Sequence, residues 1–340
     1  MNKISVLLIF CFMTATATLF AASQDSLHSK RAKEFTDLRF GMFIHLGVNT
    51  YTDQEWTDGS VAPSVFNPKE LDTDQWCRVA KSAGMKYMVL TSKHHDGFCL
   101  WNTKYTDYAI KSSPFKKDVV KMLAESCKKY GLKLGLYYSL WDRHEKCYPD
   151  TYLYTEFMKN QLQELLCNYG NIEMLWFDGV WDKCSGFGYG SPKMKGEEIM
   201  SVWRNEGTYR WQWDCIYSYI KHLNPNCLVM NNSGVDFPGI PLLPIDIRSG
   251  ERGTKDIANK KMWTFAGKDL YLPLQIEETL SKKYWFYHEG DHSIKSKEEI
   301  KKLLEDAHRM DANLLLNVGP MTNGKLRQED VLFLESLHDN

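Results

Sequence analysis

Three observations predict an α/β fold, specifically a (β/α)8 TIM-like barrel. Short apolar runs alternate about eight times with segments whose apolar residues recur at helical spacing. The runs are apolar on both faces, which is typical of a parallel sheet covered by helices. No glycine-rich phosphate loop follows the first run, which argues against an open dinucleotide-binding sheet. Eight repeats in roughly 300 residues therefore favour a closed barrel.

The first half of the chain supplies four strand candidates and three helix candidates. The strands are expected over residues 40–47, 87–92, 132–138 and 172–177. The helices are expected over residues 72–83, 119–130 and 152–168. A glycine closes each of these helices, at Gly84, Gly131 and Gly170.

The second half continues the same alternation. A long helical stretch ends near Leu223, before Pro225, and residues 227–231 form the fifth strand candidate. Weaker strand candidates follow at 245–248 and 272–276. Ser296 and Glu299 form a capping box that opens a helix over 296–310, and the last strand, 313–318, precedes a C-terminal helix. No linker separates a second domain, so residues 24–340 are predicted to form one (β/α)8 catalytic domain.

Residues 1–23 have the pattern of a signal peptide. Lys3 precedes an apolar run over residues 4–20, and Ala21 and Ser23 are small enough for a signal-peptidase site. The expected mature protein is exported, either periplasmic or secreted, and has no membrane span.

Net charge and aromatic content narrow the classes of partner. Lys and Arg total 42 and Asp and Glu total 43, a net charge of −1, so no basic field favours nucleic acid. Aromatic residues make up 13% of the chain. Such an excess indicates either a stacking surface, as for sugars, or large core residues.

Ionisable and aromatic side chains gather where the predicted strands end, which is where barrel enzymes carry their sites. The strand ends carry His45, then His94, His95 and Asp96, then the segment 139–145, then Asp178 and, after the sixth strand, Glu251. Neighbouring loops carry Glu55, Trp56, Trp101 and Trp285. We expect a functional cleft at this end. His94 and His95 would face opposite sides if the strand continued through them.

Two carboxyl groups on different strands are the minimum for glycoside hydrolysis. Asp178, behind Trp176 and before Gly179, suits the ionised group that attacks the sugar carbon. Glu251, between Gly250 and Gly253, suits the group that must hold a proton. Structural explanations remain open at this point: Asp178 as a helix cap, and Glu251 as an ion-pair partner of Arg248 or Arg252.

A metal centre is the competing chemical interpretation, because His45, His94, His95 and Asp178 could converge. No HxH pair lies on a predicted strand and no HExxH pattern lies on a predicted helix, and the cysteines lack zinc-ligand spacing. We therefore expect no metal and no organic cofactor.

Several motifs resemble family 29 glycoside hydrolases, the retaining α-L-fucosidases. These are the segments 39–48, 55–56, 93–98 with 100–101, 135–139, 176–179 and 315–320. They occur in order from about residue 39 to 320, nearly the whole predicted mature chain. The resemblance implies an exo-acting α-L-fucosidase that uses a covalent glycosyl-enzyme and a fucosylated oligosaccharide or glycoconjugate as substrate.

The resemblance also assigns roles to residues. Asp178 would be the nucleophile, and the fucose pocket would contain His45, Glu55, Trp56, His94, His95, Tyr137 and Trp176, with Trp101 and Trp285 as walls. The segment 246–253 is similar to the subgroup that acts on α-1,3/1,4 linkages and implies Glu251 as acid/base, with Glu55 and Glu277 as alternatives.

The chain departs from the family pattern in places. Leu46 stands where many members have an aromatic residue, the loop after Asp178 is extended, and the segment before Glu251 is shorter. A C-terminal β-sandwich is not expected. The second hypothesis is a barrel that binds fucose or a glycan but has lost catalysis.

Overall fold

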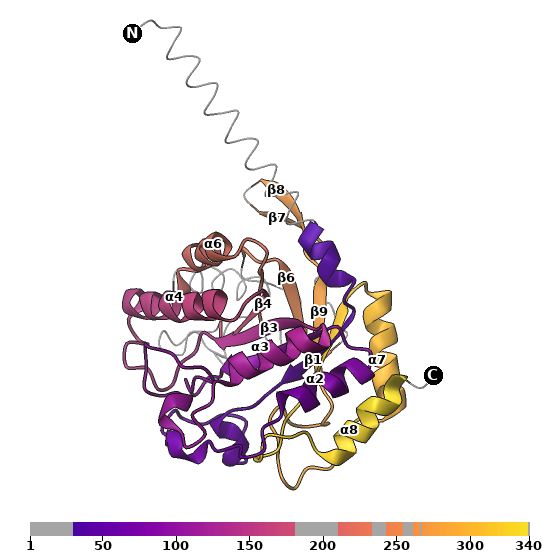
Figure 1. Ribbon diagram of the computed structural model, residues 1–340. Helices are drawn as coiled ribbons and strands as arrows, with labels where there is room; N and C mark the ends of the chain where they lie inside the picture. The colour runs from indigo at the N-terminus through magenta and orange to yellow at the C-terminus, as the bar shows by residue number, and fades with distance from the viewer. Residues whose placement is uncertain (1–29, 181–209, 233–242, 254–260, 266, 339–340) are drawn as a thin grey trace, which may run out of the picture.

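The computed structural model describes residues 30–180, 210–232, 243–253, 261–265 and 267–338. Eight strands of the described chain close into a parallel barrel, as predicted (Figure 1). They are β1 (Phe40–Ile44), β2 (Tyr87–Lys93), β3 (Lys133–Ser139), β4 (Ile172–Asp178), β5 (Leu228–Asn231), β6 (Ile247–Glu251), β9 (Leu274–Thr279) and β10 (Asn313–Val318). The order around the barrel is β1-β10-β9-β6-β5-β4-β3-β2.

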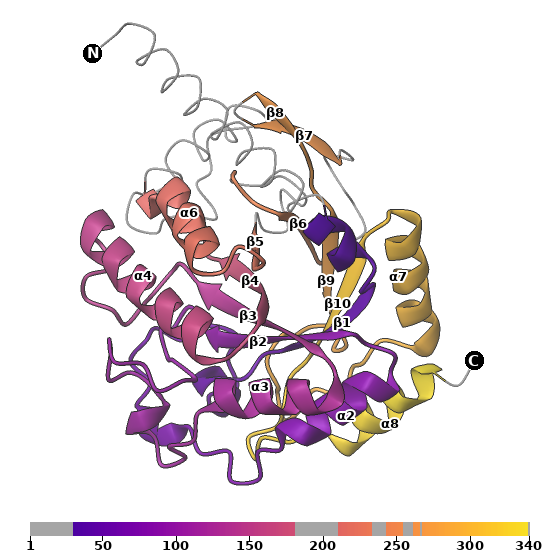
Figure 2. The same ribbon diagram turned by 45° about the horizontal axis from the view of Figure 1, so that its top comes forward.

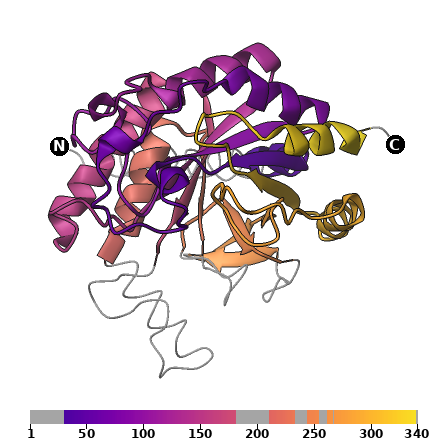
Figure 3. The ribbon, with the colours of Figure 1, turned by 90° about the horizontal axis from the view of Figure 1, so that it is seen from below.

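Helices cover the outside of the barrel. The described ones are α2 (Thr73–Ser82), α3 (Val119–Tyr130), α4 (Thr151–Asn168), α6 (Trp213–Leu223), α7 (Lys297–Arg309) and α8 (Gln328–Glu335). Short 3₁₀ segments are η1 (Val48–Tyr51), η2 (Pro63–Val65), η3 (Ile110–Ser112) and η4 (Ser336–His338). Helix α4 packs beside α6, and α2 beside α3 and α8 (Figures 2 and 3).

The helix ends follow the expected local chemistry. The Asp118 carboxylate accepts the Lys121 N–H at 2.8 Å and caps α3, and Gly131 ends that helix at φ +70°. The predicted capping box of α7 is confirmed, because Ser296 and Glu299 each accept the other's backbone N–H. Most element bounds differ from the sequence expectation by one to three residues, the usual scatter for helix and strand ends.

Two strands outside the barrel were not predicted. An antiparallel hairpin, β7 (Met262–Phe265) with β8 (Lys268–Tyr271), lies between β6 and β9. Gly267, at φ +77°, provides the left-handed turn residue of the hairpin. The short, partly polar runs flanking this turn do not have the apolar character of the barrel strands.

The core has two layers. Inside the barrel, alternate strand residues such as Phe43, Met174, Trp176, Ile247 and Leu315 pack together. A larger apolar layer separates the strands from the helices. Because inward-facing residues recur every second position, the same alternation carries Tyr137, Asp178 and Glu251 into the mouth of the barrel, where the strands end.

Within the described ranges, no helix is long and apolar enough to cross a membrane. The predicted signal peptide, residues 1–23, and the loop expected after β4, residues 185–196, lie outside the described residues.

Candidate active site

A pocket of about 230 Å³, open to solvent, lies at the C-terminal ends of the strands. Its lining contains Phe43, His45, Glu55, Trp56, His94, His95, Tyr137, Trp176, Asp178, Asn232, Glu251 and Trp285. The structure thus brings together in one pocket every site residue expected from the sequence except Trp101.

Asp178, the last residue of β4, is held by three donors. Tyr137 Oη donates to Oδ2 at 2.8 Å, and the Gly179 N–H donates to Oδ1 at 2.8 Å. Asn232 Nδ2 donates to Oδ1 at 3.2 Å. Burial raises the pKa of Asp178, while these hydrogen bonds act in the opposite direction. The carboxylate therefore faces the pocket and is not a helix cap.

Glu251, the last residue of β6, accepts a hydrogen bond from Asn232 Nδ2 at 2.6 Å. Burial, followed by the charge of Asp178, raises the pKa of Glu251 to about 7. Arg252, offered above as its ion-pair partner, instead lies over the Trp285 ring at 4.9 Å and donates to the Lys283 carbonyl at 2.8 Å. The Glu251 carboxyl group is therefore left facing Asp178.

The shared donor limits the separation of the two carboxyl groups. Asn232 Nδ2 is 3.2 Å from Asp178 Oδ1 and 2.6 Å from Glu251 Oε2, so these two oxygens are at most about 5.8 Å apart. Asn232 was not selected from the sequence. Its signal was the strand period, because Leu228 and Met230 face the barrel interior and position 232 continues that face.

Glu55 and Glu277, the other acid/base candidates, are engaged elsewhere. Glu55 lines the pocket, but its oxygens accept the N–H groups of Trp285 and Phe286 at 2.9 and 3.1 Å. The Glu277 side chain is 0% exposed and lies below the pocket, with Trp176 Nε1 donating to it at 3.1 Å. Neither carboxyl group is presented to the pocket as Glu251 is.

The hydrogen-bond network fixes the tautomers of two neutral histidines. Burial lowers the pKa of His45 to about 3, and that of His94 well below its ordinary value. His45 Nδ1 lies 2.7 Å from Asn317 Oδ1 and must donate, so its Nε2 is an acceptor. His94 Nδ1 accepts from Asn49 Nδ2 at 3.2 Å, so its Nε2 carries the hydrogen. His45 Nε2 is therefore a hydrogen-bond acceptor and His94 Nε2 a hydrogen-bond donor in this pocket.

One expectation for this region was wrong. Trp101 does not line the pocket: it is buried against α4, where Nε1 donates to Glu164 at 2.9 Å. His94 and His95 both line the pocket, as the family resemblance implies, with ring centroids 4.2 Å apart. Strand β2 ends at Lys93 after a register shift against β3, so the strand alternation does not extend through them.

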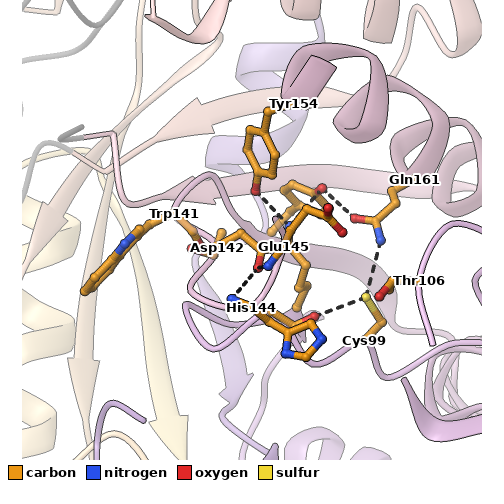
Figure 4. Close-up of polar contacts among 12 residues, drawn as sticks. Cys99, Thr106, Trp141, Asp142, His144, Glu145, Tyr154 and Gln161 are labelled. Atoms are coloured by element: carbon orange, nitrogen blue, oxygen red, sulfur yellow. Dashed lines mark hydrogen bonds and ion pairs between the residues drawn. The ribbon is translucent and has the colours of Figure 1, made fainter. Parts of the chain in front are cut away.

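Lys93, in the same motif, lies in the core rather than in the pocket. Its Nζ is 3.0 Å from both Asp142 Oδ2 and Tyr138 Oη, and 3.1 Å from Tyr154 Oη. Asp142 Oδ1 also accepts two backbone N–H groups of the following turn. Figure 4 shows Asp142 in this cluster and Trp141 directed away from it.

The Trp141 ring packs against the pocket residues His95 and Trp56, with centroid separations of 5.2 and 5.8 Å. The buried ion pair between Lys93 and Asp142 therefore holds the turn that carries Trp141 to the rim of the pocket.

Fold and pocket together define a (β/α)8-barrel protein whose site is built on carboxyl groups, histidines and aromatic rings. A model of the alpha-L-fucosidase family matches residues 60–339. The chain belongs to this family, glycoside hydrolase family 29. Among the described residues, no group of His, Cys, Asp and Glu has the arrangement of a metal site.

Similar proteins come from several kingdoms. Alpha-L-fucosidase 1 of Arabidopsis thaliana is 33% identical over 311 residues, covering 88% of this chain and 57% of the plant protein. Human plasma alpha-L-fucosidase is 27% identical, covering 95% of this chain and 69% of the human protein. The chain thus spans little more than half the length of the plant relative.

Solved structures agree with the fold. Alpha-L-fucosidase isoenzyme 1 from Paenibacillus thiaminolyticus has a TM-score of 0.72 at 29% identity, covering 92% of this chain and 75% of that one. A glycoside hydrolase 29 family member from an unknown rumen bacterium has a TM-score of 0.73 at 33% identity, covering 90% and 55%.

Proposed function

We propose that the protein is a retaining exo-α-L-fucosidase that removes terminal fucose from glycans. The observation that carries this proposal is the Asn232 amide, which contacts both Asp178 and Glu251. It keeps the two facing oxygens within about 5.8 Å, which is compatible with the separation of about 5–5.5 Å between the carboxyl groups of retaining enzymes. Membership of the α-L-fucosidase family supports fucose as the sugar.

In the first proposed step, Asp178 Oδ attacks the anomeric carbon as the glycosidic bond breaks. Glu251 gives its proton to the leaving oxygen, which departs as an alcohol. In the second step, Glu251 removes a proton from water, the water oxygen bonds to the anomeric carbon, and the ester bond to Asp178 breaks. The proton taken from water restores the acid form of Glu251, and fucose leaves with its configuration retained.

The electrostatics of the pair suit both steps. Burial and the negative charge of Asp178 raise the pKa of Glu251 to about 7, so Glu251 holds a proton near neutral pH. Formation of the ester removes the charge on Asp178. The pKa of Glu251 then falls, and the same group becomes the base of the second step.

The pocket walls suit a sugar ring. His45 Nε2 is an acceptor and His94 Nε2 a donor, so the two rings can bind different hydroxyl groups. Phe43, Trp176 and Trp285 supply apolar faces for C–H groups.

Hydrolysis of an aryl α-L-fucoside tests the activity, because an aryl leaving group needs little acid assistance. Proton NMR of the first product formed should show the α anomer of fucose. First formation of the β anomer would contradict the retaining mechanism. A pure protein that binds fucose but hydrolyses no fucoside would instead be the impaired, glycan-binding barrel.

We also propose α-1,3/1,4-linked fucose as the substrate, because the segment 246–253, which contains Glu251, resembles that subgroup. A panel of α-1,2-, 1,3-, 1,4- and 1,6-fucosylated oligosaccharides tests this. Faster release from the 1,2- or 1,6-linked compounds would refute it.

Export is proposed from the apolar run over residues 4–20 and the small residues at Ala21 and Ser23. N-terminal sequencing of the protein recovered from outside the cytoplasm should begin at Gln24. Full-length protein retained inside the cell would contradict this.

A further inference from the structure

Below the two carboxyl groups, a serine hydroxyl lies between two acceptor oxygens. Ser249 Oγ is 3.1 Å from Asn232 Oδ1 and 2.9 Å from Glu277 Oε2. The Asn232 amide cannot be reversed, because its Nδ2 donates to both Asp178 and Glu251. A hydroxyl has one hydrogen, so it can make a full hydrogen bond to only one of these acceptors. If Ser249 donates to Asn232 Oδ1, the hydrogen in its contact with Glu277 must be carried by Glu277 Oε2.

We propose that Glu277 is a neutral carboxylic acid, and that its proton orders a chain of hydrogen bonds beneath the site. In this chain Glu277 Oε2–H donates to Ser249 Oγ, and Ser249 donates to Asn232 Oδ1. Asn232 then donates to Asp178 and Glu251. Glu277, Ser249 and Asn232 are positioning residues for the two carboxyl groups, and their effect on turnover rests on the proposed function.

The remaining contacts of Glu277 fit the neutral form. Oε1 accepts from Trp176 Nε1 at 3.1 Å, as a carbonyl oxygen does. Oε2 accepts from the Gly250 N–H at 3.0 Å, which a carboxylic hydroxyl oxygen can do while it donates its own hydrogen. Both oxygens are therefore fully used with one proton present.

Burial disfavours a negative charge on Glu277, although its hydrogen bonds with Trp176, Ser249 and Gly250 lower its pKa. The side chain is 0% exposed, and β10 places Leu315 opposite it in register. The ionisable groups that act on it are Glu251 on β6 and, across the barrel, Tyr87 on β2. Burial, with the charge of Glu251 acting in the same direction, raises the pKa of Glu277 to about 8. A buried acid kept neutral to donate a hydrogen bond is an established device.

This arrangement limits the negative charge in the mouth of the barrel. With Glu277 neutral, Asp178 can ionise while Glu251 keeps its proton. If Glu277 were ionised, the hydrogen of Ser249 would turn toward it, and the Asn232 carbonyl would lose that partner. The Asn232 amide would then be held less firmly between the two reacting groups.

NMR of protein labelled with ¹³C at the glutamate side-chain carboxyl carbon tests the protonation directly, without substrate. The resonance absent from Glu277→Gln should have the shift of a protonated acid at about pH 6 and titrate near pH 8. The same spectra in a Glu251→Gln background separate the two glutamates. A carboxylate shift for Glu277 at about pH 6 would overturn the proposal.

Turnover of an aryl fucoside tests the positioning role. Glu277→Gln keeps a neutral donor toward Ser249 but no acceptor for the Gly250 N–H, so it should lose less kcat than Glu277→Ala. Glu277→Ala and Ser249→Ala should lower kcat by more than about tenfold with KM little changed. Glu277→Ala and Ser249→Ala should also shift the alkaline limb of the pH profile of kcat/KM.

The matched control is Asn313→Ala, which removes another buried amide at the opposite end of the barrel, where Nδ2 donates to the Phe35 carbonyl at 2.8 Å. It should lower stability and leave the pH profile unchanged. Equal losses in Glu277→Gln and Glu277→Ala, or an unchanged profile in Ser249→Ala, would refute the positioning role. Wild-type protein without turnover would refute the proposed function, while the NMR result for Glu277 would stand.

Discussion

At the scale of single residues, Asp178 and Glu251 are both buried carboxyl groups with different hydrogen-bond environments. Asp178 accepts from Tyr137, Gly179 and Asn232, and each of these bonds favours the ionised form. Within the described ranges, Glu251 accepts a side-chain hydrogen bond only from Asn232, and it faces the charge of Asp178. Of the two, Asp178 is better suited to carry the negative charge and Glu251 to carry the proton.

Asp178→Asn should lower kcat on an aryl α-L-fucoside by at least about 10³-fold, because an amide cannot form the glycosyl ester. The amide still has an oxygen that can accept from Tyr137 or Gly179, so the thermal unfolding curve should remain cooperative. Turnover within about tenfold of wild type would exclude Asp178 as the nucleophile.

The kcat/KM of the enzyme should fall as pH rises through about 7, because Glu251 then loses the proton it gives to the leaving group. On the acid side it should fall as Asp178 becomes protonated. Glu251→Gln should remove the alkaline limb, and azide should restore turnover of an activated aryl fucoside by Glu251→Ala. An unchanged alkaline limb in Glu251→Gln would assign the acid to another group.

At the scale of elements, the loop between β3 and α4 is fixed from inside the core. Lys93 on β2 and Asp142 in the loop form a buried ion pair, and two hydroxyl and two backbone contacts extend it. A buried pair is weak evidence for net stability, but losing one member leaves an uncompensated charge. The pair thus determines where Trp141 lies relative to the pocket.

Lys93→Met should lower the free energy of unfolding by about 3–5 kcal/mol, because Asp142 is left charged and buried. The double variant Lys93→Met/Asp142→Asn should lose less than the sum of its single variants, since Asn keeps the acceptor for the two N–H groups. Urea denaturation measures all three. The exposed pair of Lys111 and Asp107 is the control, and Lys111→Ala should cost less than about 1 kcal/mol. Additive losses in the double variant would contradict the coupling.

At the scale of the whole molecule, the barrel separates stability from the site. The apolar interior packs around Phe43, Met174 and Ile247, while the groups that bind and react occupy the strand ends above it. Because the site draws on β1 to β6 and on the loops after β1 and β9, a ligand in it contacts much of the barrel.

L-Fucose should therefore raise the melting temperature, and this increase should grow with fucose concentration. At a concentration of a hundred times Kd, the free energy of unfolding should be about 2.7 kcal/mol higher. D-Fucose has the same composition and the opposite handedness, and serves as the control. Calorimetry or fluorescence melting measures both. Equal shifts with the two enantiomers would argue against a specific pocket.

Sequence reasoning identified those parts of the site that depend on local pattern. Asp178 and Glu251 end apolar strands, and the motif residues His45, His94, His95 and Tyr137 follow or belong to strands, so their place in the pocket could be predicted. The strand period set by Leu228 and Met230 places Asn232 on the inward face, but its hydrogen bonds to Asp178, Glu251 and Ser249 could not be predicted, because they join strands far apart in sequence. Trp101 was misplaced because a tryptophan in a loop can pack inward or outward, and its partner Glu164 lies on a distant helix.

The sequence by itself determined the alternation of strands and helices, the helix caps and the family motifs, because each arises from chemistry between near neighbours in the chain. The tertiary structure decided which carboxyl groups meet, which are already occupied and which face inward. These depend on burial and on hydrogen bonds between strands far apart in sequence, such as those joining Asn232, Ser249 and Glu277. Protonation follows from that three-dimensional environment rather than from residue type.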